Sequence, residues 1–126
     1  MIRALESVLI SSEDAKTLAK FYREVIGLKQ NSEMEMGDRG EKAYEFDLKG
    51  TNLVVMDHSG IKGQNPQGAR IMFNLEVDDI EKEFARVKKE GVKVIQEVYH
   101  VEDYGLIATF EDVDGNYFQL VQIRAN

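Results

Sequence analysis

Few side chains in this chain of 126 residues are suited to catalysis. It has no cysteine, which leaves no disulfide framework, no thiolate nucleophile and no thiolate metal site. Isolated candidates for a general base are His100, Glu45 and Glu111, and none has an obvious orienting partner in the sequence. No serine occupies a nucleophile elbow. Side-chain chemistry alone therefore gives little support for a covalent or acid–base mechanism.

One acidic segment, Asp112-Val113-Asp114-Gly115, has the look of a calcium-binding loop. It lacks the full ligand spacing of such a loop, which ends in a bidentate glutamate. An Asp-Gly pair between two apolar runs is instead a good signal for a β-hairpin. We therefore predict a hairpin turn here, not a metal site.

Two stretches of the chain have the period of an amphipathic helix. Their apolar residues recur at spacings of three and four: Leu18, Tyr22, Val25 and Ile26 in the first stretch, and Ile80, Phe84 and Val87 in the second. Ser11 or Ser12 can cap the first helix and Asp78 the second. Gly27 and Gly91 supply the left-handed residue that commonly ends a helix.

Eight strand-like segments surround these helices and are separated by glycine-rich or Asp-Gly turns. They are Ala4–Ile10, Leu28–Met36, Glu41–Lys49, Thr51–Asp57, Arg70–Val77, Val92–His100, Gly105–Glu111 and Tyr117–Ile123. The order is strand-helix-strand-strand-strand, followed by a linker and the same order again. Asp14 and Asp78 are 64 positions apart, as are Gly27 and Gly91, so the repeat is one of pattern.

The pattern predicts an α+β fold of two βαβββ modules within one domain, residues 1–126. Module one spans residues 1–58, a linker spans 59–69, and module two spans 70–126. Each helix can cover only one face of its sheet, so the other faces must pack together or curve around something. A pseudo-symmetric half-open barrel with a ligand in its mouth is the expected result.

Composition and charge narrow the class of partner. The net charge of -7 opposes nucleic-acid binding, which depends on lysine and arginine neutralising phosphates. No apolar run approaches the roughly 20 residues of a membrane span. The first residues lack the features of a signal peptide, which makes the cytoplasm the default location.

Two motifs resemble the vicinal oxygen chelate superfamily, which includes glyoxalase I, extradiol dioxygenases and bleomycin-binding proteins. The first runs from Ser12-Glu13-Asp14 through Phe21-Tyr22-Arg23-Glu24-Val25-Ile26-Gly27-Leu28. The second is Asp112-Val113-Asp114-Gly115-Asn116-Tyr117-Phe118-Gln119-Leu120, with Val113 where the family usually has proline. The likeness covers essentially the whole chain, and it implies the half-open barrel and a homodimer.

Metal-using members of that family hold one divalent ion through histidines and carboxylates. The resemblance places the equivalent positions at Ser7, Met56 (or Val55), Met72 and Gln119. Hydroxyl and amide oxygens are weak ligands, and thioethers suit soft ions. A local slip would bring His58 or Glu76 toward the site, but two slips still leave two positions without a ligand. We therefore expect no metal and no other cofactor.

Strand parity and the resemblance together predict the residues that line the ligand-binding cup. They are Ser7, Met56, Met72, Asn74, Tyr117 and Gln119, with Phe46 or Tyr44 from the third strand and with His100 and Tyr104 beside the mouth. This mixture of apolar, aromatic and neutral polar groups suits an organic ligand. The alternative is that Met56 and Met72 fill a collapsed core, as flexible thioethers often do.

Three hypotheses follow. The first is a metal-free protein that binds a small aromatic or cationic, possibly antibiotic-like, organic molecule. The second is a metal-dependent glyoxalase-like lyase or isomerase, or a dioxygenase, which requires ligands outside the positions above. The third is an interaction or regulatory module that has kept the fold without a cavity.

Overall fold

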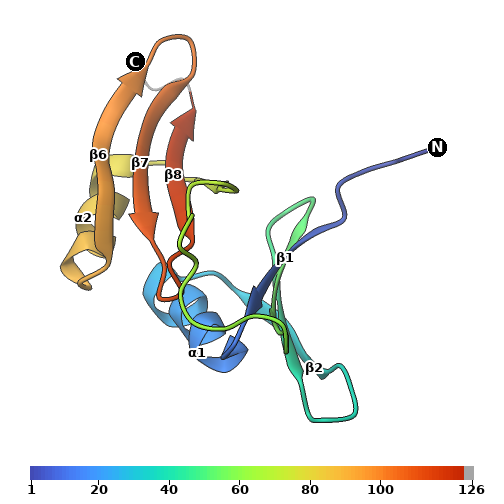
Figure 1. Cartoon of the computed structure of the whole chain (residues 1–126). Helices are drawn as coiled ribbons and strands as arrows, with labels where there is room; N and C mark the ends of the chain where they lie inside the picture. Colours follow the sequence, from blue (N-terminus) through green and yellow to red (C-terminus); the bar gives the residue numbers. More distant parts are fainter. Residues whose placement is uncertain (124–126) are drawn as a thin grey trace. The chain divides into compact units, whose positions relative to one another are not determined.

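A computed structural model of the chain describes residues 1–123. The chain divides into two compact units, Met1–Gly63 and Gln64–Asn126, and the division lies inside the predicted linker. Each unit contains one βαβββ module, built from a helical segment and a mixed four-stranded sheet (Figure 1). The α+β fold class with two such modules is thereby confirmed. No helix over residues 1–123 is long and apolar enough to cross a membrane.

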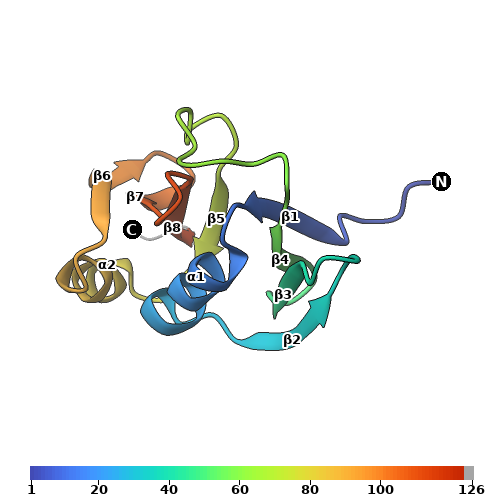
Figure 2. The ribbon, with the colours of Figure 1, turned by 60° about the horizontal axis from the view of Figure 1, so that its bottom comes forward.

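Module one consists of β1 (Ser7–Ser12), α1 (Ala15–Lys20), η1 (Phe21–Ile26), β2 (Gln30–Glu35), β3 (Lys42–Asp47) and β4 (Asn52–Asp57). Its strands lie in the order β1-β4-β3-β2 (Figure 2). The pair β1–β4 is parallel because the helix intervenes as a crossover, whereas the hairpin-connected pairs β2–β3 and β3–β4 are antiparallel.

Module two repeats this plan with β5 (Phe73–Glu76), α2 (Ile80–Lys89), β6 (Lys93–Val101), β7 (Gly105–Glu111) and β8 (Tyr117–Ile123). The strand order β5-β8-β7-β6 is equivalent to that of module one, with β5–β8 parallel. The last two strands have the bounds that the sequence predicts. Strands β1 and β5 begin three residues later than predicted, at Ser7 and Phe73.

The helix of module one begins at Asp14, the capping aspartate of the predicted repeat, and not at Ser11 or Ser12. Asp14 is the N-cap, and its side chain accepts the Thr17 N–H at 3.2 Å. Ser12 lies just before the helix, and its Oγ accepts the backbone N–H of the cap residue Asp14 at 2.9 Å. Asp57 at the end of β4 accepts the Ala15 N–H at 2.9 Å. Two carboxylates thus satisfy N–H groups that the first helical turn leaves unpaired.

The helix of module two begins one residue later than predicted, because Asp79 and not Asp78 is the cap. Asp79 accepts the Lys82 N–H at 3.2 Å. Gln122 of β8 accepts the Ile80 N–H at 2.8 Å, in the role that Asp57 has in module one. The two modules therefore correspond at an offset of 65 residues from Asp14 to Asp79, and not 64.

Each helix ends at the predicted glycine. The spacing between the two glycines is one residue shorter than the spacing between the two caps. Gly27 and Gly91 adopt the left-handed conformation, with φ of 93° and 85°, and they are 64 positions apart. The first helix therefore holds one more residue between its cap and its glycine. It accommodates that residue by widening into the π-helical segment η1, from Phe21 to Ile26.

The core of each module lies between its helix and one face of its sheet. In module one α1 packs on β3 and β4, and Leu18 of the helix is fully buried together with Phe46 and Val55 of the sheet. In module two the Phe84 ring of α2 lies 5.2 Å from that of Phe110 on β7. Phe110 and Phe118 stack in turn at 5.8 Å. Each sheet therefore has a helix-covered face that forms the core of its module. The side chains on its opposite face do not contact the helix of that module.

Candidate ligand-binding site

The face of the second sheet that α2 does not cover carries polar and aromatic side chains in adjacent rows. One row joins Asn74 of β5, Gln119 of β8 and Thr109 of β7. A second row holds Glu76, Val121, Ile107 and Tyr99, and a third holds Tyr117 with the paired Glu111 and Lys93. We call this surface the module-two face and define it by Asn74, Tyr99, Tyr104, Thr109, Tyr117 and Gln119.

Two hydrogen bonds fix the polar side chains of the module-two face. Gln119 donates its amide N–H to the Thr109 hydroxyl at 2.8 Å. Asn74 donates to the Tyr104 hydroxyl at 3.3 Å, which requires the Tyr104 side chain to extend from the β6–β7 turn across the face to β5. The carbonyl oxygens of both amides accept no hydrogen bond from residues 1–123, and the Tyr104 O–H remains able to donate.

The linker fixes a third member of the face, Tyr117. Asn65 donates its backbone N–H to the Asp114 carbonyl at 2.7 Å, and Tyr117 donates its own to the Gly68 carbonyl at 3.3 Å. Gly68 is buried so closely that a Cβ atom would lie 2.5 Å from Cδ1 of the Tyr117 ring. Only glycine allows the backbone to lie this close to the ring. The linker residues 65–68 thereby hold the Tyr117 ring at the start of β8.

The structure brings together four of the six residues predicted in module two. Asn74, Tyr104, Tyr117 and Gln119 all belong to the module-two face. Met72 precedes β5 and is exposed. His100 pairs with Leu106, in the row of the helix-covered face that contains Gln122, and thus lies on the opposite side of the sheet.

Sequence reasoning missed Tyr99, and the reason is an irregularity in β6. Strict alternation would place His100 on the same face as Gln96, which pairs with Thr109. A register shift between Gln96 and Tyr99 reverses the faces, so that Tyr99 pairs with Ile107 instead. Such bulges exchange the side chains that two faces of a strand present, and no turn residue in this segment signals one.

In module one the predicted residues divide between the two faces. Ser7 and Met56 lie on the face that the helix does not cover, in the rows of Asn52 and Ala43. Phe46 and its alternative Tyr44 lie on the helix-covered face, paired with Leu53 and Val55 and almost wholly buried. Burial raises the pKa of the Tyr44 phenol, and the Glu33 and Asp57 carboxylates add to the effect.

The counterpart of Gln119 in module one is neither Met56 nor Val55. At the 65-residue offset Gln119 corresponds to Val54, and Asn74 to Leu9, and both pairs are register partners in their sheets. Val54 shares its face with Ser7 and Met56, while Val55 lies on the helix-covered side. The correction leaves an apolar side chain at the position where the resemblance implies a metal ligand.

Other acidic and histidine candidates belong to local structure. His58 follows β4, and its Nδ1 accepts the Gly60 N–H at 2.9 Å within a turn. Glu111 pairs with Lys93 at 3.6 Å. Asp112 accepts the N–H groups of Asp114 and Asn116, which confirms the predicted hairpin turn. Within each unit, over the described part of the chain, no three His, Asp or Glu side chains gather as a metal would require.

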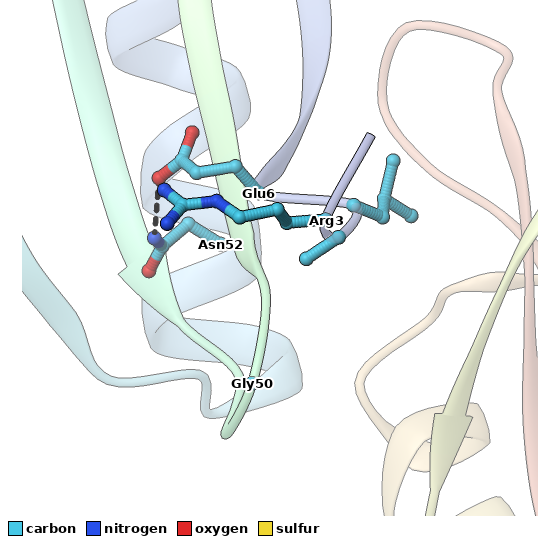
Figure 3. A pocket seen from close by; sticks show the side chains of 6 residues that line it. Arg3, Glu6, Gly50 and Asn52 are labelled. Carbon is cyan, nitrogen blue, oxygen red and sulfur yellow. Dashed lines mark hydrogen bonds between the residues drawn. The ribbon is translucent and has the colours of Figure 1, made fainter. Parts of the chain in front are cut away.

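Two open pockets lie outside the module-two face. One, of about 390 Å³, lies between the N-terminal segment and the β3–β4 turn and is lined by Arg3, Ala4, Leu5, Glu6, Gly50 and Asn52 (Figure 3). Asn52 donates to the Glu6 carboxylate at 3.2 Å along its wall. The other, also about 390 Å³, lies at the start of α2 and includes Glu76. Neither contains a residue of the predicted cup.

The chain matches the model of one protein family over most of its length. Residues 4–120 match the Glyoxalase/Bleomycin resistance protein/Dioxygenase superfamily. The chain therefore belongs to this superfamily, as the motifs predict. It is also 34% identical over 60 residues to an uncharacterized protein of Shewanella frigidimarina, which covers 48% of this chain and 44% of that protein. The matched region is thus less than half the length of that relative.

Solved structures of the same fold include proteins of different activities. TnmS3, an antibiotic binding protein from Streptomyces sp. CB03234, is 25% identical with a TM-score of 0.77, and the match covers 97% of both chains. Glyoxalase I of Leishmania major is 21% identical with a TM-score of 0.76, over 96% of this chain and 87% of that one. The fold alone does not select between binding and catalysis.

The residues at the implied metal positions decide whether a catalytic ion fits. With the corrected register these residues are Ser7, Val54, Met72 and Gln119. A hydroxyl, an isopropyl group, a thioether and an amide supply no imidazole and no carboxylate. Catalytic zinc sites have three such protein ligands and an open position. This donor set does not fit a divalent catalytic ion, and no reaction step is derived through one.

Proposed function

We propose that the protein binds small organic molecules without a metal, and that the module-two face contacts the ligand. The observation that carries the proposal is the neutral polar row of Asn74, Gln119 and Thr109 on this face. The unused amide oxygens of this row and the Tyr104 hydroxyl share the face with the rings of Tyr99 and Tyr117. Such a combination of hydrogen-bonding and aromatic groups suits a planar ligand held by stacking and a few directed bonds.

Two further observations support binding over metal-assisted catalysis. The residues at the implied metal positions are uncharged, so a Lewis acid has no site among them. One solved structure of this fold, with a match that covers 97% of both chains, is an antibiotic binding protein, so the architecture serves small-molecule binding elsewhere. The ligand class that we propose for this chain is an aromatic organic molecule that carries hydrogen-bond donors and acceptors.

A thermal-shift screen of the full chain tests the proposal. The panel contains Zn²⁺, Ni²⁺, Mn²⁺ and Mg²⁺ together with aromatic amides, phenols and heterocycles. A compound that binds only the folded state at a hundred times its Kd stabilises the fold by about 2.7 kcal/mol. We expect the melting midpoint to rise with a subset of aromatic compounds and to stay unchanged with each metal.

Matched variants locate the binding. Gln119→Ala and Asn74→Ala remove the two amides of the module-two face and are expected to abolish the shift. Asn31→Ala removes an exposed amide on β2 of module one and is expected to preserve it. Retention of one divalent ion per chain after purification without chelator, measured by emission spectrometry, contradicts the proposal. So does a screen in which no aromatic compound raises the midpoint.

A further inference from the structure

The face of the first sheet that its helix does not cover contains a carboxylate at its centre. Glu45 of β3 lies in a row with Leu9, Val54 and Ser32, one residue from each of the four strands. The next row consists of Ser11, Met56, Ala43 and Met34. We call these two rows the module-one face. Glu45 is half-buried among mostly apolar neighbours, where an ionised group loses part of its hydration.

The pseudo-symmetry shows why this carboxylate is unusual. After the helices, strands β3 and β7 correspond at an offset of 64 residues, so Glu45 corresponds to Thr109. Both pair with equivalent residues of the last strand, Glu45 with Val54 and Thr109 with Gln119. In module two the neighbouring Gln119 donates to Thr109 at 2.8 Å. In module one the neighbouring residue is Val54, which has no polar side chain. The position that is satisfied internally in one module is thus left with a charge and no such donor in the other.

The partners of other carboxylates in module one sharpen the contrast. Asp57 accepts two backbone N–H groups, from Ala15 and Lys42, both at 2.9 Å. Glu33 pairs with the Lys42 ammonium at 3.6 Å, on the opposite face of the sheet. Glu45 accepts one hydrogen bond, from the Ser32 hydroxyl at 3.3 Å.

No cation of module one compensates Glu45. Over residues 1–123 no lysine or arginine lies within 4.0 Å of its carboxylate. The rows of the module-one face contain no basic residue. A half-buried carboxylate with no counter-charge on its own face attracts the positive charge of a ligand, and this attraction is weakened less by solvent than it is at a fully exposed site.

We infer that Glu45 binds the positively charged group of an organic ligand, and that the ligand class of this protein includes alkylammonium compounds. The inference rests on the proposed function, since it assigns a second contact to a protein that binds organic molecules. Val54, Met56 and Met34 offer apolar and polarisable surface to the alkyl groups that surround an ammonium nitrogen. The carboxylate supplies the counter-charge, and Ser32 holds its orientation.

The test compares choline with 3,3-dimethylbutan-1-ol, which has the same shape but carbon in place of the charged nitrogen. Both are titrated into the ¹⁵N-labelled full chain, and amide chemical shifts are followed by NMR. We expect choline to shift the amides of Ser32, Glu45 and Val54 saturably, with a Kd about fivefold lower than that of the neutral compound. That ratio is what a partly exposed ion pair of up to about 1 kcal/mol provides.

Variants test whether Glu45 causes the preference for choline over the neutral compound. Glu45→Gln keeps the shape and removes the charge, so the two compounds are expected to bind equally. Glu33→Gln removes a carboxylate from the opposite face and is expected to keep the fivefold preference. Equal binding of both compounds to the wild-type chain, or a preference that survives in Glu45→Gln, overturns the inference.

A separate titration keeps this result apart from the proposed function. A neutral aromatic compound from the thermal-shift screen is expected to shift the amides of Asn74 and Tyr99 in module two. If it does so while choline shows no preference, the assignment of Glu45 fails and the proposed function stands. If no compound shifts module two, the proposed function fails, whatever choline does at module one.

Discussion

The two modules share a backbone plan but present different surfaces. Each sheet has the same strand order, each helix begins at an aspartate cap, and a side chain from the last strand accepts the first helical N–H. The faces covered by the helices bury large apolar side chains in both modules. The opposite faces diverge, with Glu45 and methionines in module one and with amides and tyrosines in module two.

This comparison separates two kinds of constraint. The helix-covered face must fill a core of fixed volume, so both modules retain large apolar residues there. The opposite face has no such requirement within its own module, and its side chains are free to take different chemistry. The residues that serve a ligand are therefore expected where the modules differ, not where they agree.

The largest expected effect concerns the two cores. Phe110 and Phe46 are both fully buried. Phe110 contacts the rings of Phe84 and Phe118, whereas Phe46 contacts no aromatic ring within residues 1–123. Truncation of either to alanine removes buried area and leaves a cavity, at about 3–5 kcal/mol. We expect Phe110→Ala to cost about 0.5–1.5 kcal/mol more than Phe46→Ala because aromatic pairs are lost as well. Urea unfolding of both variants measures this; equal losses would contradict it.

A smaller effect distinguishes the side chains that receive the first helical N–H. Asp57 uses both oxygens, whereas Gln122 uses only Oε1. Asp57→Asn turns one acceptor into a donor that faces the Lys42 N–H, so we expect a loss of about 1–3 kcal/mol. Gln122→Glu keeps the acceptor beside a helix N-terminus and is expected to change the stability little. Comparable losses for the two variants in thermal unfolding would contradict the expected difference between the two positions.

The smallest effect is a pH dependence at the first helix cap. Hydrogen bonds from the Thr17 side chain and backbone hold the pKa of Asp14 below its usual value of 3.8. A carboxyl whose pKa is lower when folded contributes stability above the unfolded pKa and loses it as the pH falls through the folded value. The contribution should thus begin to weaken below about pH 4 and be lost as the pH falls further, through the folded pKa. Thr17→Val removes the side-chain donor, and NMR titration should then show a higher pKa for Asp14; an unchanged value would contradict this.

Most elements of the fold were predictable from local patterns. The Asp114-Gly115 turn defined β7 and β8 to the residue, because a hairpin turn sets the register on both sides. The helix caps were less certain, since each helix start has several capping residues close together: Ser11, Ser12 and Asp14 in module one, and Asp78 and Asp79 in module two. Ser12 and Asp14 both have capping chemistry, and only the folded backbone assigns the helix N–H groups to one of them.

The candidate site was predictable only in part. Alternation from the Asp-Gly turn placed Tyr117 and Gln119 on one face correctly. Phe46 and its alternative Tyr44 lie instead on the helix-covered face of β3. His100, which the resemblance placed beside the mouth, lies on the helix-covered face of its sheet, because a bulge in β6 exchanges the two faces of that strand.

The sequence by itself determined the repeated βαβββ order, the family and the absence of cysteine chemistry, because these depend on residue types and on periodicity along the chain. Tertiary structure decided which side chains are neighbours across strands. The 65-residue correspondence, the pairing of Gln119 with Thr109, and the lack of such a partner for Glu45 all arise from registers between strands distant in sequence. Such registers are set by bulges and by packing against the helix, and one residue of slip exchanges the two faces of a strand.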